Sequence, residues 1–600
     1  MNSAADEPPL TFDDSRRLPG PNRWFDRPAV VLDALGSAAQ DESAVAAWAQ
    51  RVERLCAALG WPAPQPRAHR HGPAAASGLT LAFAAPEDAL FTATEVNEWA
   101  WERSLAAHGS LAAEGRVLLQ PASDDLDTLR PEFLRRAAAE RSAPVQRLKA
   151  AARARGLPVF EDDDSLSIGA GGGSLTWPRA ALPLPMDLPW ARLHDLPTVL
   201  VTGSNGKTTT TRLLAAMAQA AGHVPGLCST EGVLVGGETV MRGDYAGPAG
   251  ARAVLRHPGV GFAVLETARG GLLRRGLALR RADAAVITNV SADHLGEYGV
   301  HSVADIALAK AVVLHAVAAS GTAVLNGSDE VLMAVATPLA PAGRLALFAA
   351  DHDHPRLAAH RAAGGSTCGA AQGRLWLYAA SAAGQPVVDL GAVEAMPLTL
   401  GGAAGFNLEN IAAAVLAALA AGLPVSAVQA TLQHFGARPQ DNPGRLERWA
   451  WRGATVLVDY AHNPEGLAEL LAVARALKPR RLGLLLGQAG NRDDAAIAEL
   501  ARTAAGFAPD RVVVKELPGM LRGRAPGEVP TLILATLHQA GITRAQATLE
   551  PDEGRAAAAL LDWARAGDVI VLPVHTAAVR DPLAQRLASA GPGSPASPTV

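Results

Sequence analysis

A short phosphate-loop pattern stands between a predicted strand and a predicted helix. Residues 201–211 read VTGSNGKTTTT. The common phosphate loop has the pattern G-x-x-x-x-G-K-[ST], which would place its first glycine at Val201, so this loop is shorter. Gly-Lys-Thr at the start of a helix directs backbone N–H groups and the positive helix end at an anion. We therefore predict a nucleotide phosphate site made by Gly203, Ser204, Asn205, Gly206, Lys207, Thr208 and Thr209.

Two side chains of this loop have the chemistry that a nucleotide triphosphate requires. The Lys207 ammonium would contact the terminal phosphates, and the Thr208 hydroxyl would bind Mg²⁺. The alternative is a simple glycine turn before a helix, and Gly-Lys-Thr at a strand–helix junction argues against it.

Seven further stretches accompany the loop along the chain. They read VLETARGG, VITNVSADHLGEYG, ALAK, GFNLENIAAA, NPGRLER, VLVDYAHNPEGL and GQAGNRDD. Together with the short loop they resemble the Mur ligase superfamily, in the family's order, over about residues 195–580. The resemblance implies an enzyme that activates a carboxylate with ATP as an acyl phosphate, which an amine then attacks.

The same resemblance assigns roles to individual residues. It implies catalytic Lys207, Glu266, His294 and Lys310, and metal ligands Thr208, Glu266, His294 and Lys310 for Mg²⁺. It implies ATP contacts from Asn407, Asn410, Arg445 and Asp459, and substrate contacts from His462 and Arg492. Several Mur ligases carry a carbamylated lysine where Lys310 stands. The alternatives are a surface lysine for Lys310 and ordinary surface salt bridges for Arg445 and Arg492.

Apolar runs alternate with helical segments after a proline-rich boundary near position 188. This alternation predicts α/β architecture with parallel sheets covered on both faces. We predict an N-terminal α+β domain at 1–187, a central ATP-binding domain at 188–437, and a Rossmann-like C-terminal domain at 438–600 with a disordered tail from Ala588. Within the first domain, helices are expected at 42–60 and 93–109, the latter capped by Thr94.

Several segments resemble the cyanophycin synthetase branch of the superfamily, among them LRGRAPGEV at 521–529. That branch also has an ATP-grasp domain, and residues 111–190 are too few for a complete one, so one ATP site is expected. The branch implies joining of a basic amino acid such as Arg to an acidic peptide or polymer. A guanidinium prefers paired carboxylates, so an acidic pocket is expected, with Asp459, Glu465 and Glu516 as candidates.

Two other functions stay open: a catalytically silent partner subunit of a full-length synthetase, and a wall-peptide or folylpolyglutamate-type ligase. The net charge of −4 supplies no basic field for nucleic acid, and no apolar run reaches the roughly 20 residues of a membrane span. Three widely separated cysteines fit a reducing cytoplasm. We expect a cytoplasmic homo-oligomer, with a synthetase-like protein as a further candidate partner.

Overall fold

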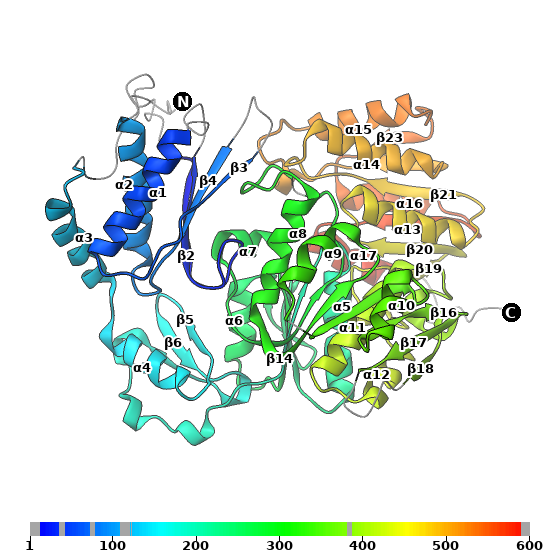
Figure 1. The fold of residues 1–600 in the computed structure, drawn as a ribbon. Helices are drawn as coiled ribbons and strands as arrows, with labels where there is room; N and C mark the ends of the chain where they lie inside the picture. The colour runs from blue at the N-terminus through cyan, green and yellow to red at the C-terminus, as the bar shows by residue number, and fades with distance from the viewer. Residues whose placement is uncertain are drawn as a thin grey trace. The chain divides into compact units, whose positions relative to one another are not determined.

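The computed structural model describes residues 12–34, 42–71, 78–107, 121, 123–293, 295–341, 343–380 and 387–589. His294, a predicted metal ligand, lies outside the described residues, as do residues 590–600 of the predicted tail. The chain forms two compact units, Met1–Leu347 with Leu416–Pro424 and Phe348–Val415 with Val425–Val600. Figure 1 shows the helices and strands of both units.

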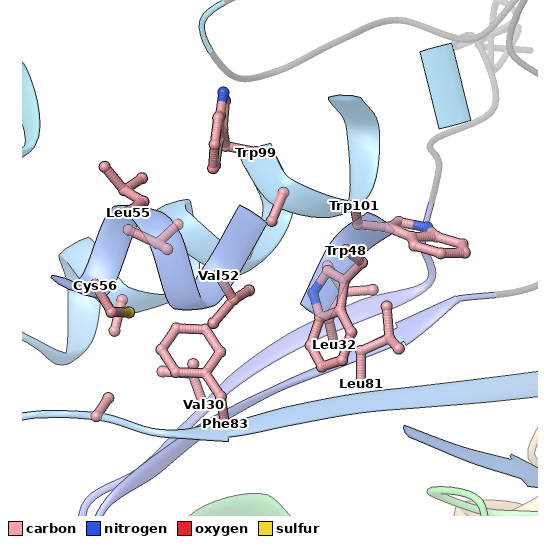
Figure 2. Packing of buried hydrophobic residues seen from close by; sticks show 14 of the residues in the cluster. Val30, Leu32, Trp48, Val52, Leu55, Cys56, Leu81, Phe83, Trp99 and Trp101 are labelled. Carbon is pink, nitrogen blue, oxygen red and sulfur yellow. The ribbon is translucent and has the colours of Figure 1, made fainter. Parts of the chain in front are cut away.

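The first unit begins with an antiparallel sheet in the order β1-β2-β4-β3, made of β1 (Asp14–Leu18), β2 (Ala29–Ala34), β3 (Arg67–His71) and β4 (Gly78–Ala84). Its helices are α1 (Glu42–Ala58), α2 (Leu90–Ala107) and α3 (Leu126–Glu140). Alternate strand residues enter different cores: Val30 and Leu32 pack with Trp48 of α1, whereas Val31 packs with Phe25. Figure 2 shows the first of these cores.

The predicted Thr94 cap is wrong, because α2 begins earlier, at Leu90. The Glu140 carboxylate of α3 accepts hydrogen bonds from the backbone N–H groups of Phe91 (2.9 Å) and Thr92 (3.1 Å). Thr94 lies inside the helix, where its hydroxyl donates to the carbonyl of Phe91. A carboxylate 48 residues away along the chain thus satisfies the helix start and adds one turn to it.

Helix α4 (Ala143–Arg153) follows and packs on a small antiparallel sheet of β5 (Val159–Glu161), β6 (Ser165–Ile168) and β7 (Leu175–Pro178). The proline-rich stretch after it forms short turns up to β8 (Thr198–Thr202). Residues 144–178 thus form a helix, three short strands and a glycine-rich turn. The predicted domain boundaries stay predictions.

A mostly parallel sheet completes the first unit. Its strand order is β11-β10-β9-β12-β8-β13-β14, in which β9, β12, β8, β13 and β14 run parallel. The remaining strands are β9 (Pro225–Ser229), β10 (Gly232–Val235), β11 (Glu238–Arg242), β12 (Phe262–Glu266), β13 (Ala282–Ile287) and β14 (Val317–Asn326). The helices are α5 (Lys207–Ala220), α6 (Pro248–Arg256), α7 (Arg269–Arg275), α8 (Val303–Ala311) and α9 (Glu330–Ala336).

The boundary between the units falls inside β15 (Leu345–Asp351). The second unit then contains α10 (Pro355–Ala362), antiparallel strands β16 (Ser366–Ala371), β17 (Arg374–Tyr378) and β18 (Val387–Ala392), the start of α11 (Phe406–Ala420), and α12 (Val425–Leu432).

The last part of the second unit is a six-stranded sheet in the order β19-β20-β24-β21-β22-β23. Its strands are β19 (Glu447–Trp451), β20 (Ala454–Asp459), β21 (Leu482–Leu486), β22 (Arg511–Val514), β23 (Ala547–Leu549) and β24 (Val569–Pro573). Its helices are α13 (Pro464–Ala476), α14 (Asp494–Gly506), α15 (Glu528–Gln539), α16 (Glu553–Trp563) and α17 (Ala577–Ser589). Leu457 and Val571 enter one core and Val456 and Ile570 another, so both faces are buried, as predicted for parallel strands.

Candidate active site

The predicted phosphate loop lies between β8 and α5. Asn205 donates its backbone N–H to the side-chain oxygen of Asn289 (2.9 Å), and its carbonyl accepts the Thr288 hydroxyl (2.6 Å). The Ser204 hydroxyl accepts the backbone N–H of Ser291 (3.0 Å). The segment after β13 therefore holds the loop in shape.

Glycine is required at both ends of this loop. Gly203 has a φ of +153°, and a Cβ there would lie 1.7 Å from the Thr288 hydroxyl oxygen. Gly206 has a φ of +80° and is the N-cap of α5, so the N-cap position carries no side chain. The positive end of a helix attracts anions, which suits a phosphate at the start of α5.

Two predicted site residues meet directly at the start of α5. The Thr208 hydroxyl donates to Glu266 Oε2 over 2.9 Å, and Glu266 ends β12 with an exposed fraction of 1%. Strand β12 pairs in parallel with β8, which places Glu266 opposite Val201 at the carboxyl edge of the sheet. Lys207 reaches back over the loop and donates to the carbonyl of Ser204 (2.9 Å).

Lys310 is buried on α8, with an exposed fraction of 4%, so it is not the surface lysine of the alternative interpretation. Burial lowers the pKa of Lys310 well below its ordinary value, and the positive charges of Lys207 and Arg269 lower it further, against Asp293. An amine held in this way is uncharged over more of the pH range and is therefore nucleophilic. We name Lys207, Thr208, Glu266 and Lys310 the phosphate-loop site.

The donor set of this site fits a magnesium nucleotide. Mg²⁺ takes oxygen ligands, keeps several waters and is commonly bound through one or two carboxylates together with phosphates. Thr208 and Glu266 lie within hydrogen-bond distance of each other at the start of α5. Among the described residues there is no group of three or more His, Cys, Asp or Glu side chains placed to hold a metal by themselves.

A second group of predicted residues lies in the second unit, after β20. Asp459 accepts the backbone N–H groups of Leu446 and Ala461, each over 2.7 Å. Burial raises the pKa of Asp459, and the charge of Arg445 opposes that rise. The Arg445 guanidinium lies 4.6 Å from the centre of the Tyr460 ring. The 445–462 residues therefore form one connected cluster.

Other residues of the predicted site make hydrogen bonds within the protein. Asn407 donates to the carbonyl of Leu398 (2.9 Å), and Asn410 donates to the side-chain oxygen of Asn407 (3.0 Å). His462 makes a 3.3 Å contact with the carbonyl of Tyr460 through Nδ1. Arg492 follows β21, and its carbonyl accepts from Arg524 (2.7 Å).

No sequence motif pointed to a buried network beside this cluster. Lys515, with an exposed fraction of 0%, pairs with Glu553 and donates to the carbonyl of Pro573 (2.5 Å). Its ammonium also lies 3.0 Å from His575 Nδ1, whose Nε2 lies 3.1 Å from the carbonyl of Ala461. Because the ammonium can only donate, His575 accepts at Nδ1 and donates from Nε2–H. The network thereby fixes the backbone between Asp459 and His462.

An acidic cluster lies on α13 and α11. Burial raises the pKa of Glu469 to about 8, helped by the charges of Glu465, Glu409 and Asp459. Two of these, Asp459 and Glu465, are candidates from the sequence for an acidic pocket. The third candidate, Glu516, instead accepts the backbone N–H of Gly527 (2.5 Å). Glu409 lies within the stretch GFNLENIAAA and Glu469 lies one helical turn after Glu465, but the sequence analysis assigned a role to neither.

Comparison with known proteins gives two family matches. The model described as Mur ligase middle domain matches residues 201–418, and the model described as Mur ligase, glutamate ligase domain matches residues 444–573. Two similar proteins are the cyanophycin synthetases of Crocosphaera subtropica, 38% identical over 56% of this chain, and of Synechocystis sp., 36% identical over 60% of it. The chain spans 38% and 40% of the lengths of those two relatives.

Solved structures also resemble this chain. FolC of E. coli, solved with DHPP and ADP, is 20% identical, with a TM-score of 0.47 over 65% of this chain and 89% of its own. MurF from Acinetobacter baumannii is 18% identical, with a TM-score of 0.45 over 66% of this chain and 77% of its own. In the part of the chain that the structure describes, no helix has the length and apolarity to cross a membrane.

Proposed function

We propose that this chain is an ATP-dependent, ADP-forming ligase that joins a free amino acid to a carboxylate of an acidic peptide or polymer. Its matches to the Mur ligase middle domain and to the Mur ligase, glutamate ligase domain support this proposal. The observation that carries it is the phosphate-loop site, where a hydroxyl, a buried carboxylate and two lysines gather at the start of a helix.

The reaction divides into two transfers. A carboxylate oxygen of the acceptor attacks the γ-phosphorus of ATP, the bond to the β-phosphate oxygen breaks, and ADP leaves. The amine nitrogen then attacks the acyl carbon, the carbon–oxygen bond to phosphate breaks, and the amine proton passes to solvent. Lys207 would stabilise the charge on the transferred group, since phosphoryl transfer depends mostly on positioning and neutralisation of charge.

Mg²⁺ would neutralise phosphate charge here, held by Thr208, Glu266, His294 and Lys310. Lys310 suits this set as a carbamate, because its low pKa leaves an uncharged amine that can add CO₂. Addition of CO₂ with loss of a proton would turn this uncharged amine into an anionic oxygen ligand. In the second unit, Asn407, Asn410, Arg445 and Asp459 are proposed to contact the nucleotide, and His462 and Arg492 the substrates.

A basic amino acid, with Arg as the first candidate, is the incoming substrate that the charge distribution favours. Burial, together with the negative charges of Glu465 and Glu409, raises the pKa of Glu469 to about 8. A guanidinium or ammonium placed among them would relieve that repulsion and form charge-assisted hydrogen bonds. The similarity to cyanophycin synthetases supports the same class of amino acid.

The test is a screen of the purified chain with ATP, Mg²⁺, short acidic peptides and each amino acid in turn, read by mass spectrometry. We expect one ADP and one phosphate per amide bond, with a mass gain of one amino-acid residue on the peptide. AMP and pyrophosphate in place of ADP would exclude the mechanism. Turnover with neutral or acidic amino acids alone would keep the ligase and reject the basic substrate. A complete absence of ATP turnover in the whole screen would favour the silent partner subunit.

Lys207→Ala tests the phosphate-loop site within the same screen. We expect turnover to fall at least ~10²-fold, the typical effect of removing one electrostatic contact to a transition state. Lys478→Ala, an exposed lysine in the second unit, is the matched control and should retain full turnover. Near-normal turnover of Lys207→Ala at saturating Mg²⁺ would refute the assignment of this loop.

A further inference from the structure

One segment of the chain touches the phosphate-loop site at both of its ends. It begins at Thr288, Asn289 and Ser291, which hold the phosphate loop through the hydrogen bonds described above. It ends on α8, where Lys310 lies close enough to Lys207 for their charges to interact. We name residues 295–305, between these ends, the bridging segment.

The bridging segment is held by the N-terminal sheet and by the loop between its strands β1 and β2. Arg23, between β1 and β2, donates to the carbonyl of Gly299 (3.2 Å) and to Asp305 Oδ1 (2.6 Å). The two side chains of this ion pair are buried, with exposed fractions of 5% for Arg23 and 14% for Asp305. One guanidinium therefore fixes two points of the segment, each through a different terminal nitrogen of its rigid fork.

Asp305 also begins the helix that carries Lys310. Its Oδ2 accepts the backbone N–H of Ser302 (3.1 Å), while the Ser302 hydroxyl accepts the backbone N–H of Asp305 (3.1 Å), which is a capping box. Burial raises the pKa of Asp305, but hydrogen bonds from Ser302 and His301 and the charge of Arg23 outweigh it, so the pKa lies below its ordinary value. Lys310 follows five residues later, about 7.5 Å along the helix axis, so a displaced helix start displaces Lys310.

A second contact comes from β3 and β4. Thr80 donates its hydroxyl proton to Asp33 (2.7 Å), so its oxygen accepts from His71 Nε2–H (3.1 Å). His71 Nδ1 is then an acceptor and receives His301 Nε2–H over 3.0 Å, with the two rings stacked 4.9 Å apart. This chain of donors starts at His301 on the bridging segment and ends at Asp33 in the sheet.

The close approach of His71 leaves no room for a side chain at position 299 of the bridging segment. Gly299 has a φ of +69°, and a Cβ there would lie 2.9 Å from His71 Cδ2. The Arg16 guanidinium of β1 lies 5.0 Å from the centre of the Tyr298 ring. Residues of β1, of β3 and of the loop between β1 and β2 thus contact one short segment.

From these contacts we infer that the N-terminal domain is a positioning module for the phosphate-loop site, acting through Arg23 and His71 on the bridging segment and so on Lys310. Arg23 and His71 are positioning residues, because each acts on the site through the 295–305 backbone. The catalytic meaning of this inference rests on the proposed function, whereas the mechanical coupling does not.

Arg23→Gln, in the full-length chain, tests the coupling by hydrogen–deuterium exchange. We expect backbone exchange of residues 299–310 to rise at least tenfold, while α1 and α2 keep their protection. The apparent Kd for a fluorescent ATP analogue with Mg²⁺ should rise at least fivefold. Arg51→Gln is the control, because it removes a partly buried arginine paired with Asp124 in the same domain but away from the segment.

Two further variants keep the test decisive if Arg23→Gln does not fold. Asp305→Asn removes the same ion pair and keeps a capping oxygen, so it should reproduce the exchange at 299–310. Arg23→Lys keeps one contact in place of two, so its backbone exchange at 299–310 should lie between those of wild type and Arg23→Gln. Unchanged exchange in both Arg23→Gln and Asp305→Asn, or the same increase in Arg51→Gln, would overturn the inference. Increased exchange with an unchanged Kd for the ATP analogue would refute the effect on the phosphate-loop site. Neither measurement requires ligase turnover.

Discussion

Replacement of Lys515 by Met should destabilise the second unit strongly. Lys515 is fully buried, and its ammonium has three acceptors: Glu553, the carbonyl of Pro573 and His575 Nδ1. Without it, Glu553, with an exposed fraction of 5%, keeps hydrogen bonds from backbone N–H groups of His575 and Thr576 but loses its counter-charge. Breaking a buried pair by removing one partner costs about 3–5 kcal/mol.

This cost translates into a measurable shift. For a unit of this size, about 1 kcal/mol lowers Tm by roughly 2–4 °C, so Lys515→Met should lower it by roughly 6–20 °C. Calorimetry measures this, with Lys478→Met as the exposed control. The double variant Lys515→Met/Glu553→Leu should recover most of the loss, because an apolar pair replaces an ion pair at little net cost. A single variant within 1 kcal/mol of wild type, or a double variant no more stable than the single one, would refute the reasoning.

The pH dependence provides an independent check on the same residue. Burial lowers the pKa of Lys515 from 10.5 to about 8, against the charge of Glu553. Between pH 8 and pH 10.5 the unfolded chain therefore binds the proton and the native chain does not, so this group makes stability rise with pH in that window. Urea unfolding of the wild type at pH 8 and pH 10 should show this contribution as a larger free energy of unfolding at pH 10. Lys515→Met should lack that increase.

Two further predictions concern the first unit. Burial lowers the pKa of His71 below 6.5, so the unfolded chain takes up a proton first as pH falls, and stability should decrease below about pH 6.5. Urea unfolding at pH 7.5 and 5.5 measures this, and His71→Gln should reduce the difference; an unchanged difference would contradict it. Gly203→Ala should weaken ATP binding at least tenfold by calorimetric titration, because its Cβ would strike Thr288. Gly222→Ala, with a φ of +87° but open space around it, should bind ATP normally.

Local sequence was sufficient to predict the elements that depend on neighbouring backbone. The short loop predicted a phosphate site, and the structure places Lys207 and Thr208 in the first turn of a helix behind a buried strand. Glu266 was equally predictable, since it ends a buried strand and parallel strands end at one edge. Alternating apolar strands and helices indicated parallel sheets, because strand and helix periodicities are properties of the backbone itself.

Tertiary structure alone decided which distant residues support these motifs. Glu140 caps a helix 48 residues earlier and overrides the local Thr94 signal, while Arg23 meets Asp305 across 282 residues. Lys515 and His575 are 60 residues apart, and neither has a spacing that signals a partner. Burial made these pairings obligatory, because a charge removed from water must find its counter-charge or hydrogen bonds wherever the packing brings them. That choice depends on which faces of the strands and helices pack together, which no local pattern encodes.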